Sequence, residues 1–313
     1  MQFATPFSVL DGGLSTALER AGHDLAHHLW TARLLVTEPE AIVRAHLSYL
    51  RAGAEIVITA SYQASIAGFI GEGMDRAEAI ATIGLTTELA REASRRFVAE
   101  RGRAQVPTVA ASVGPYGATL ADGSEYHGRY PVGDGLLRDF HRERLEILVA
   151  SEPDLLACET IPSAAEAAII AGSLDGLPVL PTWFTFTCPD GEHTASGDPI
   201  EDAVEAVAGV PGLVALGVNC SSPEHVGELL SRIGSRSALP LVVYPNLGRT
   251  WDGEQHCWIG EDGIGTDAWP VEDWVDAGVR VLGGCCGTAE ADVAALRRVR
   301  DAFDPIEPPD LVA

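Results

Sequence analysis

Two adjacent cysteines near the C-terminus, Cys285 and Cys286, have the sequence context of a chemical site. They follow an apolar run that predicts a strand, and they lie between glycines, which let the backbone turn sharply and come close to a ligand. Neighbouring Cα atoms are about 3.8 Å apart, whereas a relaxed disulfide needs about 5.5 Å. The pair therefore predicts a metal site or a reactive-thiol site rather than a disulfide between neighbours.

A third cysteine, Cys220, ends another apolar run, at 215–219. Three thiolates from two strand ends would make a zinc site of the catalytic kind, in which three protein ligands leave the fourth position open. We therefore expect Zn²⁺ bound by Cys220, Cys285 and Cys286. Cys158 and Cys188 are predicted to be buried core residues. The pair His256-Cys257 lies in a polar loop and is predicted to be solvated.

Composition limits the possible partners and compartments. The 313 residues, 46% of them hydrophobic, can bury a large core. A net charge of -24 argues against nucleic acid or an anionic membrane as a partner. No apolar run approaches the roughly 18 residues of a membrane span, and no signal-peptide pattern opens the chain. Six cysteines, two of them adjacent, fit reduced thiols better than a disulfide scaffold. We expect a cytoplasmic protein.

The chain contains no lysine, because all 21 Lys+Arg residues are arginines. Schiff-base aldolases and pyridoxal-phosphate enzymes need a lysine amine. A phosphate-binding Walker loop needs a lysine as well. The sequence therefore excludes these three classes of site.

Apolar runs and helical patterns alternate along the whole chain. Eight runs predict strands, at 7–13, 55–60, 106–113, 154–158, 177–186, 213–219, 241–244 and 279–282. Helical patterns occupy 38–53, 75–100, 135–150, 163–173, 199–208, 223–233, 269–277 and 288–300. This alternation predicts an α/β fold, with residues 1–313 forming a single (β/α)8 TIM barrel domain. A doubly wound sheet is the main alternative, but no dinucleotide-binding glycine fingerprint follows the first strand.

Barrel enzymes place their chemistry at the carboxyl ends of the strands. Glu159 lies at such an end, where an unpaired carboxylate would be costly, so a functional role is favoured. Asp11, before Gly12 and Gly13, is as readily a turn-capping residue as a functional one. Tyr62, Tyr116, Tyr126 and Trp251 can face a cation or simply pack.

Several collinear motifs carry a resemblance that spans nearly the whole chain. They are Leu10-Asp11-Gly12, the segments 58–64, 112–117, 121–126 and 156–160, Val243-Tyr244-Pro245-Asn246, and the cysteine segment 283–288. With these motifs the chain resembles the homocysteine S-methyltransferase family, zinc-dependent barrels that methylate the thiol of homocysteine. It is similar to the short members that use S-methylmethionine, and we expect no extra domain that would hold cobalamin.

The resemblance implies a role for each matching residue. Cys220, Cys285 and Cys286 match the zinc ligands, and Asn246 matches a resting fourth ligand or a group beside the metal. Glu159 and Asp11 match the residues that hold the amino group of homocysteine. Backbone amides of Gly12 and Gly13 would bind its carboxylate. The implied methyl donor is a sulfonium, S-methylmethionine or S-adenosylmethionine, and the product is methionine.

Three alternatives stay open on the sequence. The acceptor can be selenocysteine or another thiol. The protein can be a thiol redox protein that uses Cys285 and Cys286. It can also be a noncatalytic zinc-binding barrel, in which a fourth strong ligand would occupy the open position of the metal. The oligomeric state is not predicted.

Overall fold

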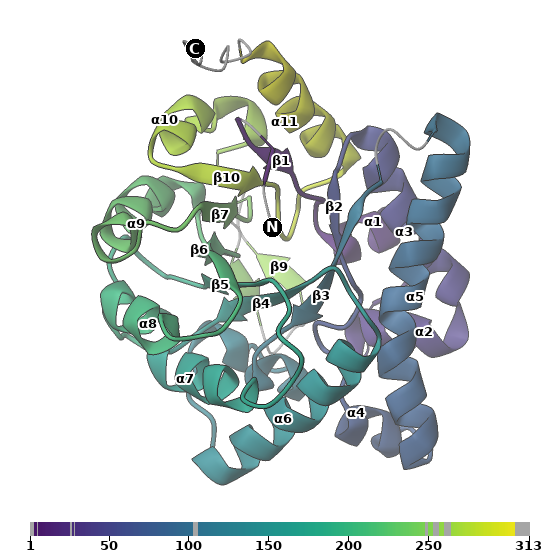
Figure 1. Ribbon diagram of the computed structural model, residues 1–313. Coiled ribbons are helices and arrows are strands. Elements are labelled where there is room, and N and C mark those ends of the chain that lie inside the picture. The colour runs from purple at the N-terminus through teal and green to yellow at the C-terminus, as the bar shows by residue number, and fades with distance from the viewer. Residues whose placement is uncertain are drawn as a thin grey trace, which may run out of the picture.

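Eight parallel strands form a barrel that is surrounded by helices (Figure 1). The computed structural model describes residues 3–4, 6–25, 27, 29–102, 106–247, 250–252, 257–259 and 264–303; for 250–252 and 257–259 it describes the backbone only. The strand order is β1-β10-β7-β6-β5-β4-β3-β2. A parallel bridge between Leu10 and Ile56 joins the two ends of this sheet. The predicted (β/α)8 TIM barrel is confirmed.

Each of the eight predicted strands overlaps one strand of the barrel, and β4 continues three residues beyond its predicted end. They are β1 Ser8–Val9, β2 Ile56–Ile58, β3 Thr108–Val113, β4 Leu155–Ile161, β5 Thr182–Phe186, β6 Leu213–Asn219, β7 Leu241–Tyr244 and β10 Val279–Leu282. The run at 177–186 is shorter than predicted, because Pro178 and Pro181 cannot donate ladder hydrogen bonds. An antiparallel pair, β8 Thr250–Asp252 and β9 Cys257–Ile259, follows β7.

The predicted helices form at the expected places. They are α3 Pro39–Ala52, α5 Arg76–Arg101, α6 Asp134–Ala150, α7 Ala164–Ser173, α8 Ile200–Val207, α9 Pro223–Arg236, α10 Val271–Asp276 and α11 Glu290–Ala302. Asp75 and Glu78 form a capping box that starts α5, and Gly53, with φ 118°, ends α3. Three short helices were not predicted: α1 Leu14–Arg20, α2 Leu34–Thr37 and α4 Ile66–Gly71.

The interior of the barrel is a packed core rather than a pore. The fully buried Trp183 fills it beside small residues such as Ala110 and Ala215. A second core lies between the strands and the helices, and it contains Cys158 and Cys188, as predicted. A ligand must therefore bind at the mouth of the barrel.

Within the described part of the chain, no helix combines the length and the apolar character that crossing a membrane requires.

Candidate active site

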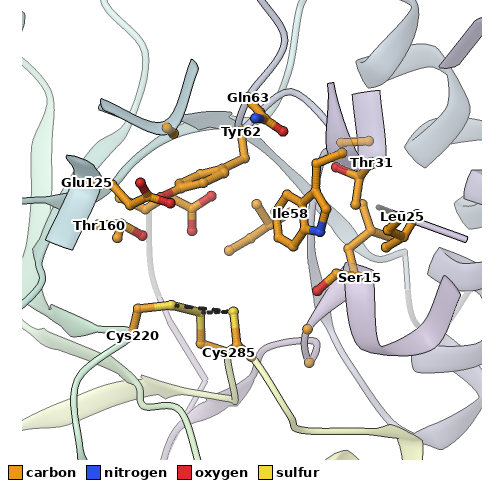
Figure 2. Close-up of a pocket in the computed structure, with 18 of the residues that line it drawn as sticks. Ser15, Leu25, Thr31, Ile58, Tyr62, Gln63, Glu125, Thr160, Cys220 and Cys285 are labelled. Carbon is orange, nitrogen blue, oxygen red and sulfur yellow. Dashed lines mark hydrogen bonds between the residues drawn. A yellow bond between two sulfur atoms is a disulfide. The ribbon is translucent and has the colours of Figure 1, made fainter. Parts of the chain in front are cut away.

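A cavity of about 130 Å³ opens at the carboxyl ends of the strands (Figure 2). Segments that are far apart in the sequence contribute to its wall, since each follows a different strand. The lining includes Asp11, Gly12, Gly13, Trp30, Ile58, Tyr62, Glu125, Tyr126, Glu159, Thr160, Cys220, Tyr244, Cys285 and Cys286. Seven of the eight predicted site residues are therefore brought together here, and Asn246 is not in the lining.

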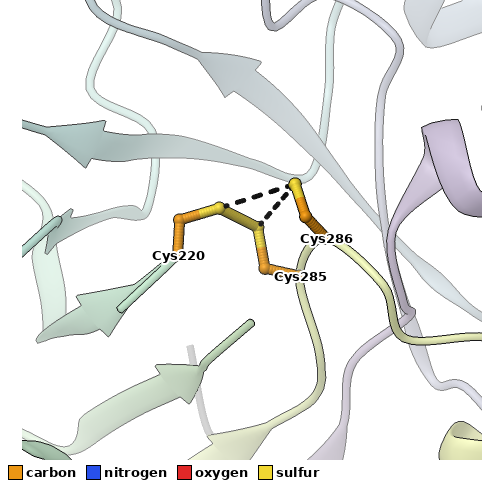
Figure 3. A group of neighbouring side chains, drawn as sticks. All are labelled: Cys220, Cys285 and Cys286. Atoms are coloured by element: carbon orange, nitrogen blue, oxygen red, sulfur yellow. Dashed lines mark hydrogen bonds between the residues drawn. A yellow bond between two sulfur atoms is a disulfide. The ribbon is translucent and has the colours of Figure 1, made fainter. Parts of the chain in front are cut away.

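The three predicted metal ligands converge at one side of this cavity. The Sγ atoms of Cys220, Cys285 and Cys286 all lie within 4.8 Å of one another, and Figure 3 shows the three side chains pointing toward a common centre. Among the described residues they form a group that could hold a metal ion. The sulfur of Cys286 lies 3.8 Å from that of Cys220 and 3.9 Å from that of Cys285.

Cys220 and Cys285 are joined by a disulfide. The prediction of reduced thiols is wrong for this pair, because the ends of β6 and β10 bring the two Cα atoms to 5.6 Å, an ordinary disulfide distance. The adjacent residues Cys285 and Cys286 are not bonded to each other, as their spacing predicted. A disulfide sulfur is a poor metal ligand, so the three cysteines can form a full thiolate set only when this bond is reduced.

Asn246 contacts the metal-ligand candidate Cys220 through its backbone. The buried side-chain amide of Asn246 donates to the carbonyl of Cys220 at 3.1 Å. Cys220 has φ 48°, in the left-handed region that a residue with a Cβ adopts only when its surroundings hold it there. This contact is one such restraint. The structure thus gives Asn246 a positioning contact outside the cavity lining, and its role in substrate binding, as a resting fourth ligand or as a group beside the metal stays a prediction.

The glycine turn after β1 packs directly against the cysteine turn after β10. A Cβ on Gly13 would lie 2.7 Å from the carbonyl oxygen of Cys285, so a side chain there would displace that turn. The amide of Gly13 donates to Thr288, at 3.2 Å from both its carbonyl and its hydroxyl oxygen. Of the two predicted amides, that of Gly12 is therefore the better placed to meet a ligand carboxylate.

Asp11 and Glu159 are buried carboxyls that face the cavity, with 4% and 6% of their surface exposed. The amide of Ile58 donates to Asp11 at 2.9 Å, and the hydroxyls of Ser112 and Tyr244 donate to Glu159. Burial raises the pKa of Glu159 to about 7. Burial also raises the pKa of Asp11, and the nearby charge of Glu159 raises it further. Two neighbouring carboxyls of this kind favour a bound cation, which would lower both pKa values.

A reciprocal amide contact links the two strands that carry Glu159 and Cys220. Thr160 donates its backbone N–H to Asn219 Oδ1, and Asn219 Nδ2 donates to Thr160 Oγ1, both at 2.7 Å. Thr160 has φ 57°, again in the left-handed region. Because Thr160 follows Glu159 and Asn219 precedes Cys220, this contact fixes the carboxyl relative to the sulfur.

Unusual backbone conformations gather around the cavity. Of the five described non-glycine residues with positive φ, only Glu152 lies outside the lining; the other four are Trp30, Ala121, Thr160 and Cys220. Such conformations cost roughly 1–3 kcal/mol each and persist where surrounding structure holds them, often at functional sites. This clustering supports the cavity as the functional site independently of any motif.

Sequence reasoning assigned no role to several of the lining residues, among them Glu125 and Trp30. Glu125 lies in the motif 121–126 that carries the family resemblance, and this was the available signal; Trp30 had none. Of the aromatic candidates, Tyr62 and Tyr126 line the cavity, and Tyr62 packs edge-on against Trp30. Tyr116 packs instead against Tyr130 and Phe140. The side chain of Trp251 and the residue His256 lie outside the described part of the chain.

A family model described as homocysteine S-methyltransferase matches residues 8–300. The chain belongs to this family. As a member of this family, the protein is a methyltransferase. The barrel fold and the cysteines at its strand ends agree with this assignment. The resemblance that rested on the sequence motifs is confirmed.

Several relatives align with this chain over nearly its full length. The homocysteine S-methyltransferase of Escherichia coli (strain K12) is 46% identical over 291 residues, which cover 92% of this chain and 94% of that protein. A selenocysteine Se-methyltransferase of Brassica oleracea var. italica is 40% identical and covers 93% of this chain and 88% of its own. The crystal structure of the Escherichia coli homocysteine methyltransferase MmuM in its metallated form has a TM-score of 0.84 at 44% identity, over 94% of this chain and 96% of that one. Its oxidized form matches with the same values.

Proposed function

We propose that this methyltransferase transfers a methyl group from a sulfonium donor to the thiol of L-homocysteine and so produces methionine. The observation that carries the proposal is the convergence of three cysteine sulfurs and two buried carboxyls on one cavity. Sulfur ligands suit activation of a thiol, and paired carboxyls suit an α-amino group. The names of the relatives, at 39–46% identity, support homocysteine as the acceptor.

Cys220, Cys285 and Cys286 would hold Zn²⁺ once the disulfide is reduced. Their donor set fits that metal, because zinc is commonly bound by thiolates and three protein ligands leave one position for a substrate. When bound, Zn²⁺ would remove the proton of an incoming thiol, whose pKa of about 8.5 otherwise keeps it mostly protonated at neutral pH. Asn246 and the turn around Gly13 would hold the cysteine backbone for this purpose.

Asp11 and Glu159 would bind the amino group of the acceptor. Their orientation is already set by Ile58, Ser112 and Tyr244, so the chain needs no rearrangement to present two carboxylates to an ammonium. An ammonium between them would lower their raised pKa values and keep both ionised. The acceptor thiol would then point toward the cysteine cluster, and the amide of Gly12 would meet the carboxylate.

In the transfer step, the thiolate of homocysteine attacks the methyl carbon of the donor. The bond between the donor sulfur and this methyl breaks, its electron pair stays on the donor sulfur, and the new S–CH₃ bond forms from the thiolate pair. No proton moves in this step, so the protein acts by orienting the two sulfurs and by excluding water. Both products are neutral thioethers, which lose the Coulomb attraction that held the reactants.

S-methylmethionine is the proposed donor. The motifs of the chain resemble those of the short family members that use S-methylmethionine, and this resemblance supports the choice. We therefore expect a higher kcat/KM with S-methylmethionine than with S-adenosylmethionine, and no turnover with betaine.

The function is tested with reduced, zinc-loaded protein and homocysteine, offered each donor in turn, with methionine as the measured product. The control variant is Cys188→Ala, since Cys188 is a buried cysteine outside the cavity lining. The proposal requires methionine from a sulfonium donor in both proteins. If no sulfonium donor yields methionine, the proposed reaction is wrong; turnover with betaine would overturn only the choice of donor.

Selenocysteine is a second candidate acceptor, because a relative named selenocysteine Se-methyltransferase is 40% identical to this chain. The same assay with selenocysteine in place of homocysteine, at equal concentrations, gives the ratio of kcat/KM values. We expect this ratio to favour homocysteine.

A further inference from the structure

The cavity carries one carboxyl more than the acceptor requires. Among the residues that the structure describes, three carboxyls line it, those of Asp11, Glu125 and Glu159, and no arginine does. In the proposed function, the amino group of homocysteine occupies the pair Asp11 and Glu159. The third carboxyl, on Glu125, is then left to face whatever enters the cavity second.

Glu125 lies in the short turn η3 (Ser124–Tyr126), within the segment that follows β3. Its Oε2 atom is buried and has no hydrogen-bond partner among the described residues. Burial, with a further contribution from Asp122, raises the pKa of Glu125 to about 7. A buried carboxylate oxygen without a partner is costly, so a cation that docks beside it is stabilised by relief of that cost as well as by direct attraction.

The position of Glu125 is built into the fold. Glu166, on α7, accepts hydrogen bonds from the amide of Tyr116 at 2.7 Å and from the hydroxyl of Tyr130 at 2.7 Å. It also contacts Nε2 of His141 at 2.8 Å. A Cβ on Gly117 would lie 2.6 Å from the amide nitrogen of Glu125, so this segment is closely packed. The backbone that carries Glu125 is therefore held in place by the packing of this segment.

The surroundings of Glu125 are suited to a sulfonium in particular. Tyr62 and Tyr126 line the same cavity, and the charge of Glu125 contributes to raising the pKa of both. Aromatic faces attract cations, and a sulfonium has no N–H or O–H to donate, so it is recognised by charge and by ring faces rather than by hydrogen bonds. The pair Asp11 and Glu159, with several donors around it, is instead a hydrogen-bonding environment.

We propose that Glu125 recognises the positively charged sulfur of the methyl donor and thereby determines donor specificity. Figure 2 shows Glu125 and Tyr62 on the side of the cavity opposite Cys220 and Cys285. A sulfonium held by Glu125 would thus face the sulfurs that are proposed to activate the acceptor. This inference rests on the proposed function, because the role of the two other carboxyls is taken from it.

The test measures ligand binding to zinc-loaded, reduced protein by calorimetry, for the wild type and for Glu125→Gln. The probes are S-methylmethionine, dimethylsulfoniopropionate, which keeps a sulfonium and a carboxylate but lacks an amino group, and homocysteine. We expect Glu125→Gln to weaken both sulfonium compounds by a similar factor, about tenfold or more, because a full countercharge is lost. Homocysteine affinity and zinc content should stay unchanged.

Each other outcome overturns the assignment. A loss for S-methylmethionine alone would place Glu125 beside the amino group, and an equal loss for homocysteine would make it an acceptor residue. No loss, or no binding of dimethylsulfoniopropionate to the wild type, would also contradict the proposal. Glu125→Asp, which keeps the charge, should recover part of the affinity, and Glu88→Gln on the exposed face of α5 is the matched control. Methionine formation by the wild type tests the proposed reaction separately.

Discussion

The two walls of the cavity hold their carboxyls in different ways. Asp11 and Glu159 follow or end barrel strands, and each accepts hydrogen bonds from neighbouring strands. Glu125 lies on a connecting segment, and one of its oxygens has no partner among the described residues. A wall made of strand ends is preorganised for a group that does not change, such as the amino group of an amino acid. A wall on a connecting segment can vary without disturbing the barrel, and we infer that it selects the donor.

The largest expected effect comes from the three cysteines that line the cavity. Alanine in place of Cys220, Cys285 or Cys286 should reduce methionine formation to background and remove bound zinc, because two thiolates do not make a stable site of this type. Zinc content by atomic emission and unfolding by circular dichroism are the measurements. The barrel should remain folded, since the sulfurs line the cavity rather than the core. Full zinc retention in all three variants would refute the metal assignment.

The link between Glu159 and the metal-ligand candidate Cys220 is tested by Asn219→Ala. Asn219 is buried and makes both 2.7 Å contacts with Thr160, so truncation leaves buried groups unpaired and removes the restraint on a left-handed residue. We expect the free energy of unfolding in urea to fall by about 3 kcal/mol. We also expect the KM for homocysteine to rise, because Glu159 precedes Thr160. A loss of stability with unchanged KM would show that this contact does not position the carboxyl.

The wall made of strand ends is tested by Glu159→Gln. The KM for homocysteine should rise by the equivalent of about 1.5–3 kcal/mol, since a charge-assisted bond to the amino group is lost. The KM for the donor and the zinc content should not change. This pattern is the reverse of that expected for Glu125→Gln, so the two variants together separate the walls. Loss of zinc with retained homocysteine affinity would instead assign Glu159 to the metal.

The smallest effect concerns the pH dependence of stability in the metal-free protein. The pKa of Glu125 rises to about 7 on folding, so the folded protein holds more protons than the unfolded chain from the ordinary pKa of 4.5 up to that value. Stability therefore falls as pH rises through this window. In Glu125→Gln, the free energy of unfolding should decrease by about 1–2 kcal/mol less over this pH window than in the wild type. This difference is smaller than the full change in pKa implies, because the side chain is partly exposed. Parallel urea profiles for both proteins would contradict the raised pKa.

The sequence predicts what depends on local pattern. Apolar runs located all eight strands, and their ends located Cys220, Glu159 and the adjacent cysteines, because the strands of a parallel barrel all present their carboxyl ends at one mouth. The short helices α1, α2 and α4 escaped prediction because they have too few turns to show a helical period.

Features that depend on distances between segments could not be predicted. The disulfide between Cys220 and Cys285 follows from the spacing of two strand ends that are 65 residues apart in sequence. Likewise, two contacts exist only once the strands are assembled. They are the hydrogen bond of Asn246 to the Cys220 carbonyl and the reciprocal contact between Asn219 and Thr160. Glu125 lies on a connecting segment that shows neither helical nor strand periodicity, so the sequence does not predict its position.

We infer that homocysteine binds through its sulfur at the metal held by the three cysteines. X-ray absorption at the zinc edge, on reduced and zinc-loaded protein, tests it most directly, because sulfur scatters differently from nitrogen and oxygen. Before substrate is added, we expect three sulfur ligands and one lighter ligand at the zinc; with homocysteine, we expect four sulfur ligands. An unchanged spectrum at saturating homocysteine, or four sulfur ligands in its absence, would contradict the claim.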